Sequence, residues 1–125
     1  MCKGLGLDLC QISRMEELAH DERFLARYFT EEEAAYIASR GSCAAQTTAG
    51  IFAAKEAFVK ALGVGVTIPM RDVGVTHTVS GQPCYALTGK AAELASGCTC
   101  MLSISHEADM AAAVCIIFAN QEHQA

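Results

Sequence analysis

The alanine-rich segment from residue 44 to residue 62 places the strongest constraint on how this chain can fold. Its apolar residues recur at helical spacing and form one stripe: Ile51, Ala54, Phe58 and Leu62. Gly63 and Gly65 follow directly, as is typical of a helix end. A long helix with one apolar stripe needs an apolar surface to cover it, so the remaining segments have to supply that surface.

That surface is predicted to be a sheet, because other segments alternate between apolar and polar residues with the period of a strand. The alternation occurs in five segments: 4–12, 72–79, 84–88, 99–105 and 109–118. Ser80 and Gly81 supply a turn between the second and third segments, and residues 106–108 form a tight hairpin between the last two. Leucines occupy one side of the first segment, so Asp8 points away from them.

Three further segments have the signature of helices: 13–28 (in one or two pieces), 31–40 and 89–96. Ser13 is available as the N-cap of the first, with Glu16 as its capping-box partner. Thr30 and Glu33 repeat this pattern before the second. The order of strand, helices and then mostly strands predicts an α+β fold with an antiparallel sheet packed on the long helix.

Length and composition narrow the class of protein further. The 125 residues are enough for one domain, 1–125, and 52% hydrophobic residues exclude intrinsic disorder. Such an apolar small chain is typical of a protein that buries part of its surface in an oligomer. No apolar run reaches the roughly 18 residues of a membrane span, and no export signal precedes the first strand, so we expect a cytoplasmic protein without a membrane partner.

Charge and cysteine content exclude further classes. The net charge of −5 argues against a general nucleic-acid-binding protein. The seven cysteines are an odd number and are scattered, several within apolar runs. They indicate reduced thiols packed as small hydrophobic side chains, since structural zinc sites use paired Cys-x-x-Cys spacing.

Two carboxylates stand in unusually apolar surroundings, Asp8 between leucines and Glu56 within the long helix. Desolvating an ionised carboxylate costs several kcal/mol unless a cation compensates, so each needs a lysine, an arginine or a metal ion. Hard oxygen ligands of this kind suit Mg²⁺. Lys60 lies one turn after Glu56, where it could form an ordinary i,i+4 salt bridge or stand beside a metal-bound phosphate. Spacing alone leaves both interpretations open.

Other polar residues near turns are weaker candidates. Ser105 and His106 end a strand, but no nucleophile elbow is present and adjacent strand residues point to opposite faces. His77 lies on the polar side of its strand, so we expect it to be exposed. Gly4 and Gly6 do not form a dinucleotide-binding fingerprint, because the third glycine and an immediately following helix are missing.

Three arginines concentrate positive charge on the first helical region of this acidic chain: Arg14, Arg23 and Arg27. The simplest interpretation is that these arginines lie on a solvent-exposed face of the protein. Met15 and Phe24 nearby would also make it a basic surface with apolar anchors, which suits an acidic protein partner.

Together these segments resemble the holo-acyl-carrier-protein synthases, the short phosphopantetheinyl transferases. The resemblance covers nearly the whole chain and rests on three segments: 4–14, 52–63 and 103–107. The middle one is the most specific, because F-x-x-K-E-A-x-x-K-A-L-G combines an acid, two lysines and a glycine stop in fixed register. The chain departs from the family pattern at Cys10 and Gln11, where valine and an acid are usual, and at Gln82, where lysine is common.

The resemblance implies a phosphopantetheinyl transferase fold and transfer of the 4'-phosphopantetheine of coenzyme A to a serine of apo acyl carrier protein, releasing adenosine 3',5'-bisphosphate. Asp8 and Glu56 match the family's ligands for Mg²⁺, with Mn²⁺ as an alternative, and Lys60 matches the lysine that stabilises charge on the transferred phosphate. These three are the implied catalytic residues. The implied coenzyme A contacts are grouped near the two hairpins and the lysine: Lys60, Gly81, Pro83, Ser105 and His106.

The resemblance also implies a carrier-protein surface made by the arginines at 14, 23 and 27, and a homotrimer with active sites between protomers. Two other functions stay open from the residues alone. A Mg²⁺-dependent nucleotide pyrophosphohydrolase would use the same carboxylates but needs more acidic residues clustered on one helix. A non-catalytic carrier-protein-binding module would keep the arginines and lose the metal pair.

Overall fold

The computed structural model describes residues 1–121. Its strands are β1 (Cys2–Gln11), β2 (Val73–His77), β3 (Pro83–Leu87), β4 (Cys98–Glu107) and β5 (Met110–Ala119). Its α-helices are α1 (Met15–Leu18), α2 (Glu22–Tyr28), α3 (Glu31–Ala38), α4 (Ala44–Leu62) and α5 (Gly89–Leu94). Short 3₁₀ turns, η1 (Gly41–Cys43) and η2 (Met70–Asp72), precede α4 and β2. None of the helices described combines the length and apolar character needed to cross a bilayer.

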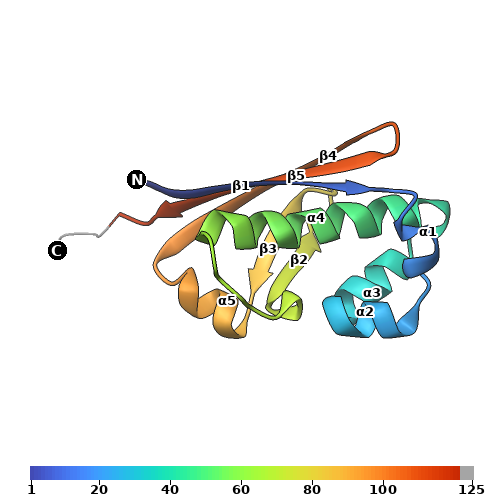
Figure 1. Cartoon of the computed structure of the whole chain (residues 1–125), viewed down its shortest axis with the longest axis horizontal. Helices are drawn as coiled ribbons and strands as arrows, with labels where there is room; N and C mark the ends of the chain where they lie inside the picture. The colour runs from blue at the N-terminus through green and yellow to red at the C-terminus, as the bar shows by residue number, and fades with distance from the viewer. Residues whose placement is uncertain (122–125) are drawn as a thin grey trace.

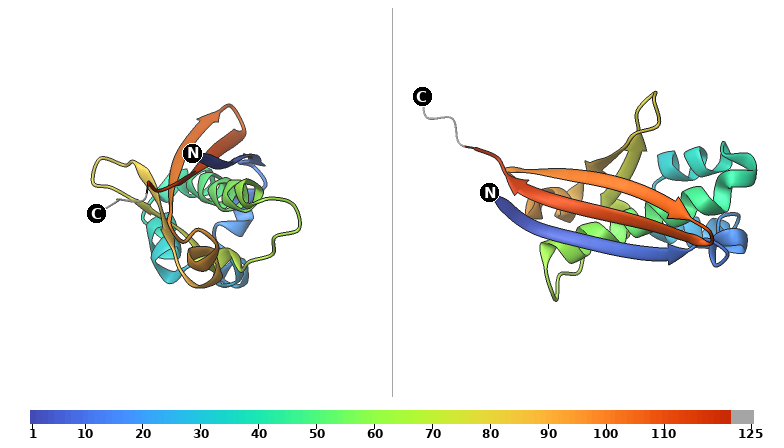
Figure 2. Two further views of the ribbon diagram at one scale, coloured as in Figure 1. Left: turned by 90° about the vertical axis from the view of Figure 1, so that its left-hand side faces the viewer. Right: turned by 90° about the horizontal axis from the view of Figure 1, so that it is seen from above.

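The strands are antiparallel throughout and form two sheets. One contains three strands in the order β1-β5-β4, and the other is the β2–β3 hairpin. Helix α4 runs along the inner side of the three-stranded sheet, while α1, α2 and α3 gather at one end of the molecule (Figure 1). Figure 2 shows the three strands side by side over the helix. The expected α+β fold is confirmed, with the strands divided between two sheets.

Helix α4 has the bounds that the sequence predicts, Ala44–Leu62, and ends at Gly63, whose φ is 118°. Its position against β1 depends on two glycines. A Cβ at Gly4 or Gly6 would collide with the backbone carbonyls of Ala61 and Ala57 in α4. Because neither glycine has a side chain, the strand can lie directly on the helix backbone.

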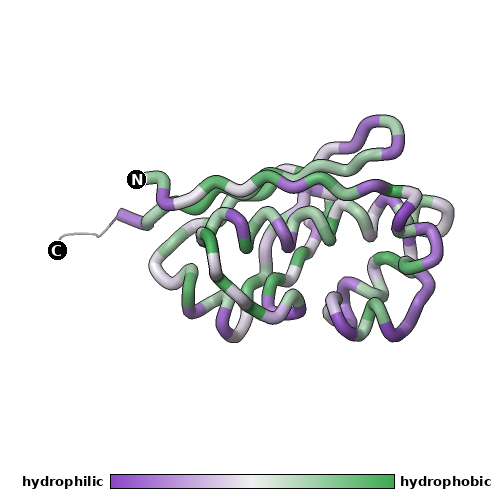
Figure 3. Tube along the Cα trace, viewed as in Figure 1, coloured by the Kyte–Doolittle hydropathy of each residue, from purple (hydrophilic) through white to green (hydrophobic). Residues whose placement is uncertain are grey.

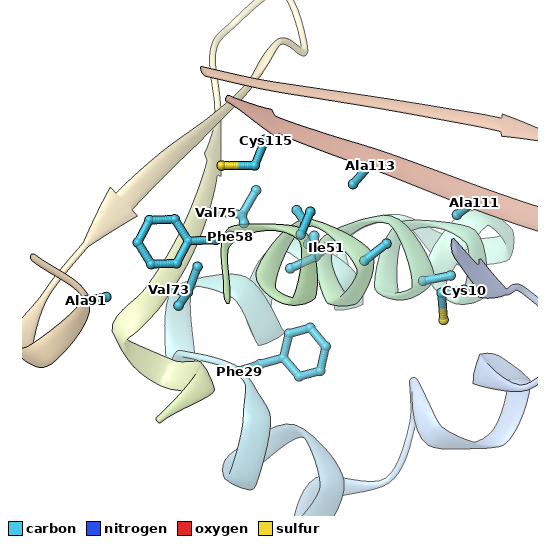
Figure 4. Packing of buried hydrophobic residues seen from close by; sticks show 14 of the residues in the cluster. Cys10, Phe29, Ile51, Phe58, Val73, Val75, Ala91, Ala111, Ala113 and Cys115 are labelled. Carbon is cyan, nitrogen blue, oxygen red and sulfur yellow. The ribbon is translucent and has the colours of Figure 1, made fainter. Parts of the chain in front are cut away.

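The core fills the space between α4, the three-stranded sheet and the β2–β3 hairpin (Figure 4). Its largest buried apolar side chains include Phe29, Ile51 and Phe58. Cys10 and Cys115 are buried among these apolar residues, as expected for thiols that pack as hydrophobic side chains, and all seven cysteines are free.

The N-terminal caps of the helices agree only in part with those that the sequence predicts. The capping box at Thr30 and Glu33 is confirmed, with both side-chain-to-backbone hydrogen bonds formed. The predicted cap at Ser13 is wrong: its backbone N–H and hydroxyl both donate to the carboxylate of Asp109, at 2.9 and 2.6 Å. The 13–28 region forms two helices, and Asp21 caps the second.

The expected hairpin at residues 106–108 is shifted along the chain. His106 and Glu107 belong to β4, and Ala108 with Asp109 forms the turn. Ala108 has a φ of 51°, in the left-handed region. Its identity offers no turn signal, because alanine is rarely used there.

The outer face of the three-stranded sheet is apolar and exposed. Hydrophobic residues colour much of β1 and β5 in Figure 3. Leu5, Leu7 and Leu9 on β1 are 65%, 59% and 61% exposed, and Met101 on β4 is 57% exposed. Asp8 does point away from the leucines, as predicted, but the side that packs on α4 is the one that contains Gly6, Asp8 and Cys10.

Candidate active site

The contact between β1 and α4 brings together the three residues predicted to be catalytic. The Lys60 ammonium lies 2.8 Å from Asp8 Oδ1 and donates a second hydrogen bond to the carbonyl of Leu7 at 3.2 Å. Within residues 1–121 no ion pair joins Lys60 to Glu56, so the ordinary i,i+4 salt bridge does not form. The close approach of β1 offers Lys60 a nearer carboxylate on the neighbouring strand.

The electrostatics of this group leave Glu56 poorly compensated. Its side chain is half-buried, and this burial together with the charge of Asp8 raises the pKa of Glu56 above its ordinary value, while Lys60 and Arg14 oppose the shift. Lys60 is more exposed, and its hydrogen bond and charge interaction with Asp8 raise the pKa of its ammonium group. The site therefore holds two carboxylates and one ammonium, with net negative charge.

This donor set fits a hard divalent cation better than a soft one. Asp8 and Glu56 supply carboxylate oxygens only, and Mg²⁺ typically binds through one or two protein carboxylates with waters and substrate phosphates completing its shell. No cluster of three or more metal-ligating side chains exists in the part of the chain that the structure describes. The arrangement thus suits an ion shared with a substrate rather than a closed structural site.

Three of the predicted coenzyme A contacts line one cavity of about 210 Å³: Gly81, Pro83 and His106. The amide nitrogen of Gln46, near the start of α4, lies 3.0 Å from Nε2 of His106, and this hydrogen bond orients the imidazole. Ser105 does not line this cavity, because adjacent residues of β4 face opposite sides of the sheet. The cavity shares no lining residue with the group formed by Asp8, Glu56 and Lys60.

His77 also lines this cavity, and the prediction that it is exposed is wrong. Its ring stacks on Tyr36 of α3, with centroids 4.1 Å apart and planes 14° from parallel. Burial and the nearby Arg40 lower the pKa of His77, while Glu33 opposes the shift. The alternation along β2 indicates on which side of the strand His77 lies. It does not show that α3 covers that side, because α3 is distant from β2 in the sequence.

The three predicted docking arginines are exposed at the end of the molecule formed by α1 and α2. Arg14 lies over the ring of Phe52 at 5.8 Å, and Arg27 over Tyr28 at 5.2 Å. None of the three forms an ion pair among residues 1–121. Their charges are therefore available to an acidic partner.

A buried ion pair between Glu33 of α3 and Lys55 of α4 escaped the sequence analysis. The two groups are 2.8 Å apart, with side-chain exposures of 2% and 0%. Burial lowers the pKa of Lys55, and the charge of Glu33 opposes the shift. Lys55 stands among alanines in an apolar helix, which is a usable signal for a buried lysine, whereas the local pattern around Glu33 indicates only a capping role.

Comparison with known proteins places this geometry in a family. The profile described as 4'-phosphopantetheinyl transferase superfamily matches residues 4–115. The chain is 41% identical over 121 residues to the holo-[acyl-carrier-protein] synthase of Treponema denticola, covering 94% of this chain and 98% of that protein.

Solved structures agree with the sequence comparison. The holo-[acyl-carrier-protein] synthase of Neisseria meningitidis superposes with a TM-score of 0.80 at 30% identity, covering 94% of this chain and 99% of that one. The holo-(acyl-carrier-protein) synthase of Bacillus anthracis, solved in complex with CoA (3',5'-ADP), gives a TM-score of 0.78 at 30% identity over 94% and 96% of the two chains. On these matches, which span almost the entire fold, the chain belongs to the 4'-phosphopantetheinyl transferase superfamily.

Proposed function

We propose that this protein transfers the 4'-phosphopantetheine of coenzyme A to a serine of apo acyl carrier protein and releases adenosine 3',5'-bisphosphate. The observation that carries the proposal is the convergence of Asp8, Glu56 and Lys60 in a chain matched along residues 4–115 by the phosphopantetheinyl transferase superfamily. The relatives named holo-[acyl-carrier-protein] synthase, including one bound to CoA (3',5'-ADP), support the same substrates.

Asp8 and Glu56 are the proposed ligands of Mg²⁺, with Mn²⁺ as an alternative. When bound, the ion would neutralise negative charge on the pyrophosphate oxygens of coenzyme A. Burial and the charge of Asp8 raise the pKa of Glu56, and this supports the role because a bound cation would favour the charged form of the carboxylate.

In the proposed reaction, the serine oxygen of the carrier protein attacks the phosphorus attached to pantetheine. The bond from that phosphorus to the bridging oxygen of the nucleotide breaks, and the nucleotide departs with this oxygen. The serine proton passes to a base at the carboxylate pair. Lys60, held by Asp8 and the Leu7 carbonyl, stabilises the charge that develops on the phosphoryl and leaving oxygens.

The cavity bounded by Gly81, Pro83 and His106 is the proposed site for the nucleotide part of coenzyme A. Ser105 faces the outer side of β4, away from this cavity, so we do not assign it to the nucleotide bound there. At about 210 Å³ the cavity is smaller than typical sites for drug-sized ligands. A second copy of the chain is therefore proposed to complete the site.

We propose that the protein assembles as a homotrimer through the apolar outer face of the three-stranded sheet. Leu5, Leu7, Leu9 and Met101 on this face are each more than half exposed, which is unfavourable for a free monomer. The separation of the cavity from the carboxylate pair supports active sites between protomers.

Arg14, Arg23 and Arg27 are proposed to dock the acidic carrier protein, which lets a chain of net charge −5 bind a partner of like charge through a local basic surface. We further propose that residues 1–125 act as one catalytic domain in the cytoplasm. The free cysteines support a reducing compartment.

The proposed activity is tested by incubating the protein with apo acyl carrier protein, coenzyme A and Mg²⁺, and weighing the intact carrier protein by mass spectrometry. The expected result is a mass gain of one phosphopantetheine that a chelator abolishes. A folded protein that modifies none of several carrier proteins contradicts the proposal. Nucleotide release from coenzyme A alone would then indicate a pyrophosphohydrolase, and carrier binding without release would indicate a binding module.

A further inference from the structure

The Glu33–Lys55 ion pair is buried completely, although a buried ion pair is a costly way to hold a fold together. Lys55 uses all three donors of its ammonium group: Glu33 Oε1 at 2.8 Å, the carbonyl of Met70 at 3.0 Å and the carbonyl of Val73 at 2.8 Å. Two of these acceptors are backbone atoms of η2 and the start of β2. The lysine thus holds a specific stretch of backbone against α4.

Glu33 completes the same network from the side of α3. Its Oε1 also accepts from the backbone N–H of Thr30 at 2.8 Å, and its Oε2 accepts from the backbone N–H of Val75 at 2.9 Å. The pair therefore joins α3 and α4 to three successive backbone points, Met70, Val73 and Val75. Hydrogen bonds to backbone atoms are directional, so they fix the position of β2 along the helices as well as its contact with them.

A second contact between α3 and β2 follows in register with the first. Tyr36 lies three residues after Glu33, and His77 lies two residues after Val75, so both pairs occur on facing sides of the helix and the strand. Their stacked rings are 4.1 Å apart. β2 is thus held on α3 along most of its length.

The tip of the hairpin is coupled to this anchored strand. His77 pairs with Pro83, the N–H of Thr78 donates to the carbonyl of Gln82 at 2.9 Å, and the N–H of Gly81 donates to the carbonyl of Thr78 at 2.8 Å. Displacing β2 along α3 would therefore displace Gly81 and Pro83, which line the cavity proposed for coenzyme A.

We propose that the Glu33–Lys55 pair is a positioning device, which sets the β2–β3 hairpin against α4 and thereby places Gly81 and Pro83 for coenzyme A binding. This inference rests on the proposed function. Apolar side chains of similar volume could stabilise the same junction. They could not hold the three backbone groups in register, and this difference separates a positioning role from a purely structural one.

The test compares Lys55→Met and the double variant Glu33→Met/Lys55→Met with the wild-type chain, using Lys90→Met at an exposed lysine as the matched control. The double variant leaves no unpaired buried charge and is therefore expected to melt at a higher temperature than Lys55→Met, although it removes the hydrogen-bond partners of four backbone groups. Coenzyme A affinity is measured directly by calorimetry, and KM for coenzyme A and for carrier protein is measured separately.

In the folded double variant we expect the Kd and KM for coenzyme A to rise about tenfold because the hairpin loses its register. The KM for carrier protein should stay within about twofold of wild type. Wild-type coenzyme A affinity in the double variant, equal changes in both KM values, or failure of the double variant to fold would each overturn the positioning role. Absence of coenzyme A binding by the wild-type chain would instead contradict the proposed function.

Discussion

Glu56 is a carboxylate whose charged form is disfavoured by its position between α4 and β1. Burial and Asp8 raise the pKa of Glu56, and Lys60 does not compensate fully because its ammonium is bonded to Asp8. A half-buried carboxylate next to a second carboxylate lowers the stability of the free protein. Groups that bind a cation or transfer a proton are often found in such unfavourable surroundings.

Glu56→Gln should lower the rate of phosphopantetheine transfer by about 10³-fold, because the proposed metal site loses one of its two carboxylates. Its melting temperature should be equal to or above that of the wild-type chain, since the repulsion between the two carboxylates is removed. Transfer is followed by carrier-protein mass and unfolding by circular dichroism, with Glu93→Gln as an exposed control. A Glu56→Gln enzyme with normal Mg²⁺-dependent activity would exclude Glu56 from the mechanism.

Cys115 predicts a pH dependence of stability. Burial raises the pKa of its thiol from 9.0 to about 11. The unfolded chain therefore loses this proton at lower pH than the folded chain does, so stability falls as pH rises from 9 towards 11. We expect urea unfolding to show a loss of about 2 kcal/mol across that range. Cys115→Val should show a shallower decline, and identical declines in the two proteins would contradict the assignment.

At the scale of single elements, the helix α4 and the capping box of α3 were predictable because their signals are local. The stripe through Phe58 and the stop at Gly63 lie within the helix and its immediate flank. Thr30 and Glu33 are three residues apart. The cap at Ser13 was mispredicted because its partner, Asp109, lies at the other end of the chain. Local sequence patterns contain no information on such a competitor.

The contact between β1 and α4 depends on Gly6. In a Gly6→Ala variant the new methyl group would meet the carbonyl of Ala57, so the strand has to move away from the helix. We expect a loss of about 2 kcal/mol in unfolding free energy, from the overpacking. Transfer activity should fall as well, since Asp8 moves with the strand. Lys3→Ala, an exposed position on β1, is the control, and unchanged stability of Gly6→Ala would contradict the close approach.

At the scale of the whole molecule, the apolar outer sheet face and the small volume of the cavity are the two features that support the proposed assembly. The outer face contributes exposed leucines from β1 and Met101 from β4. The cavity and the carboxylate pair lie apart in one chain. In the proposed assembly, a neighbouring copy covers the outer sheet face and completes the cavity. Stability and activity should therefore both depend on protein concentration.

Leu7→Asp should convert the proposed trimer into monomers, because it places a carboxylate from each copy in the apolar contact. Light scattering coupled to size-exclusion chromatography measures the mass, and the transfer assay measures the consequence, which we expect to be loss of activity. Thr67→Asp, at an exposed loop position, should leave the mass unchanged. A fully active Leu7→Asp monomer would contradict an active site shared between copies.

The sequence by itself determined the α+β class, the bounds of α4 and the identity of Asp8, Glu56 and Lys60 as candidates, because these depend on short-range periodicity and on motif spacing. Only the tertiary structure decided which side of β1 meets the helix, that Lys60 pairs with Asp8 rather than Glu56, and that Lys55 pairs with Glu33. Each of those outcomes is a choice between partners far apart in the chain. The partner is determined by how closely the backbones approach and how deeply the side chains are buried. Neither follows from the spacing of residues along the chain.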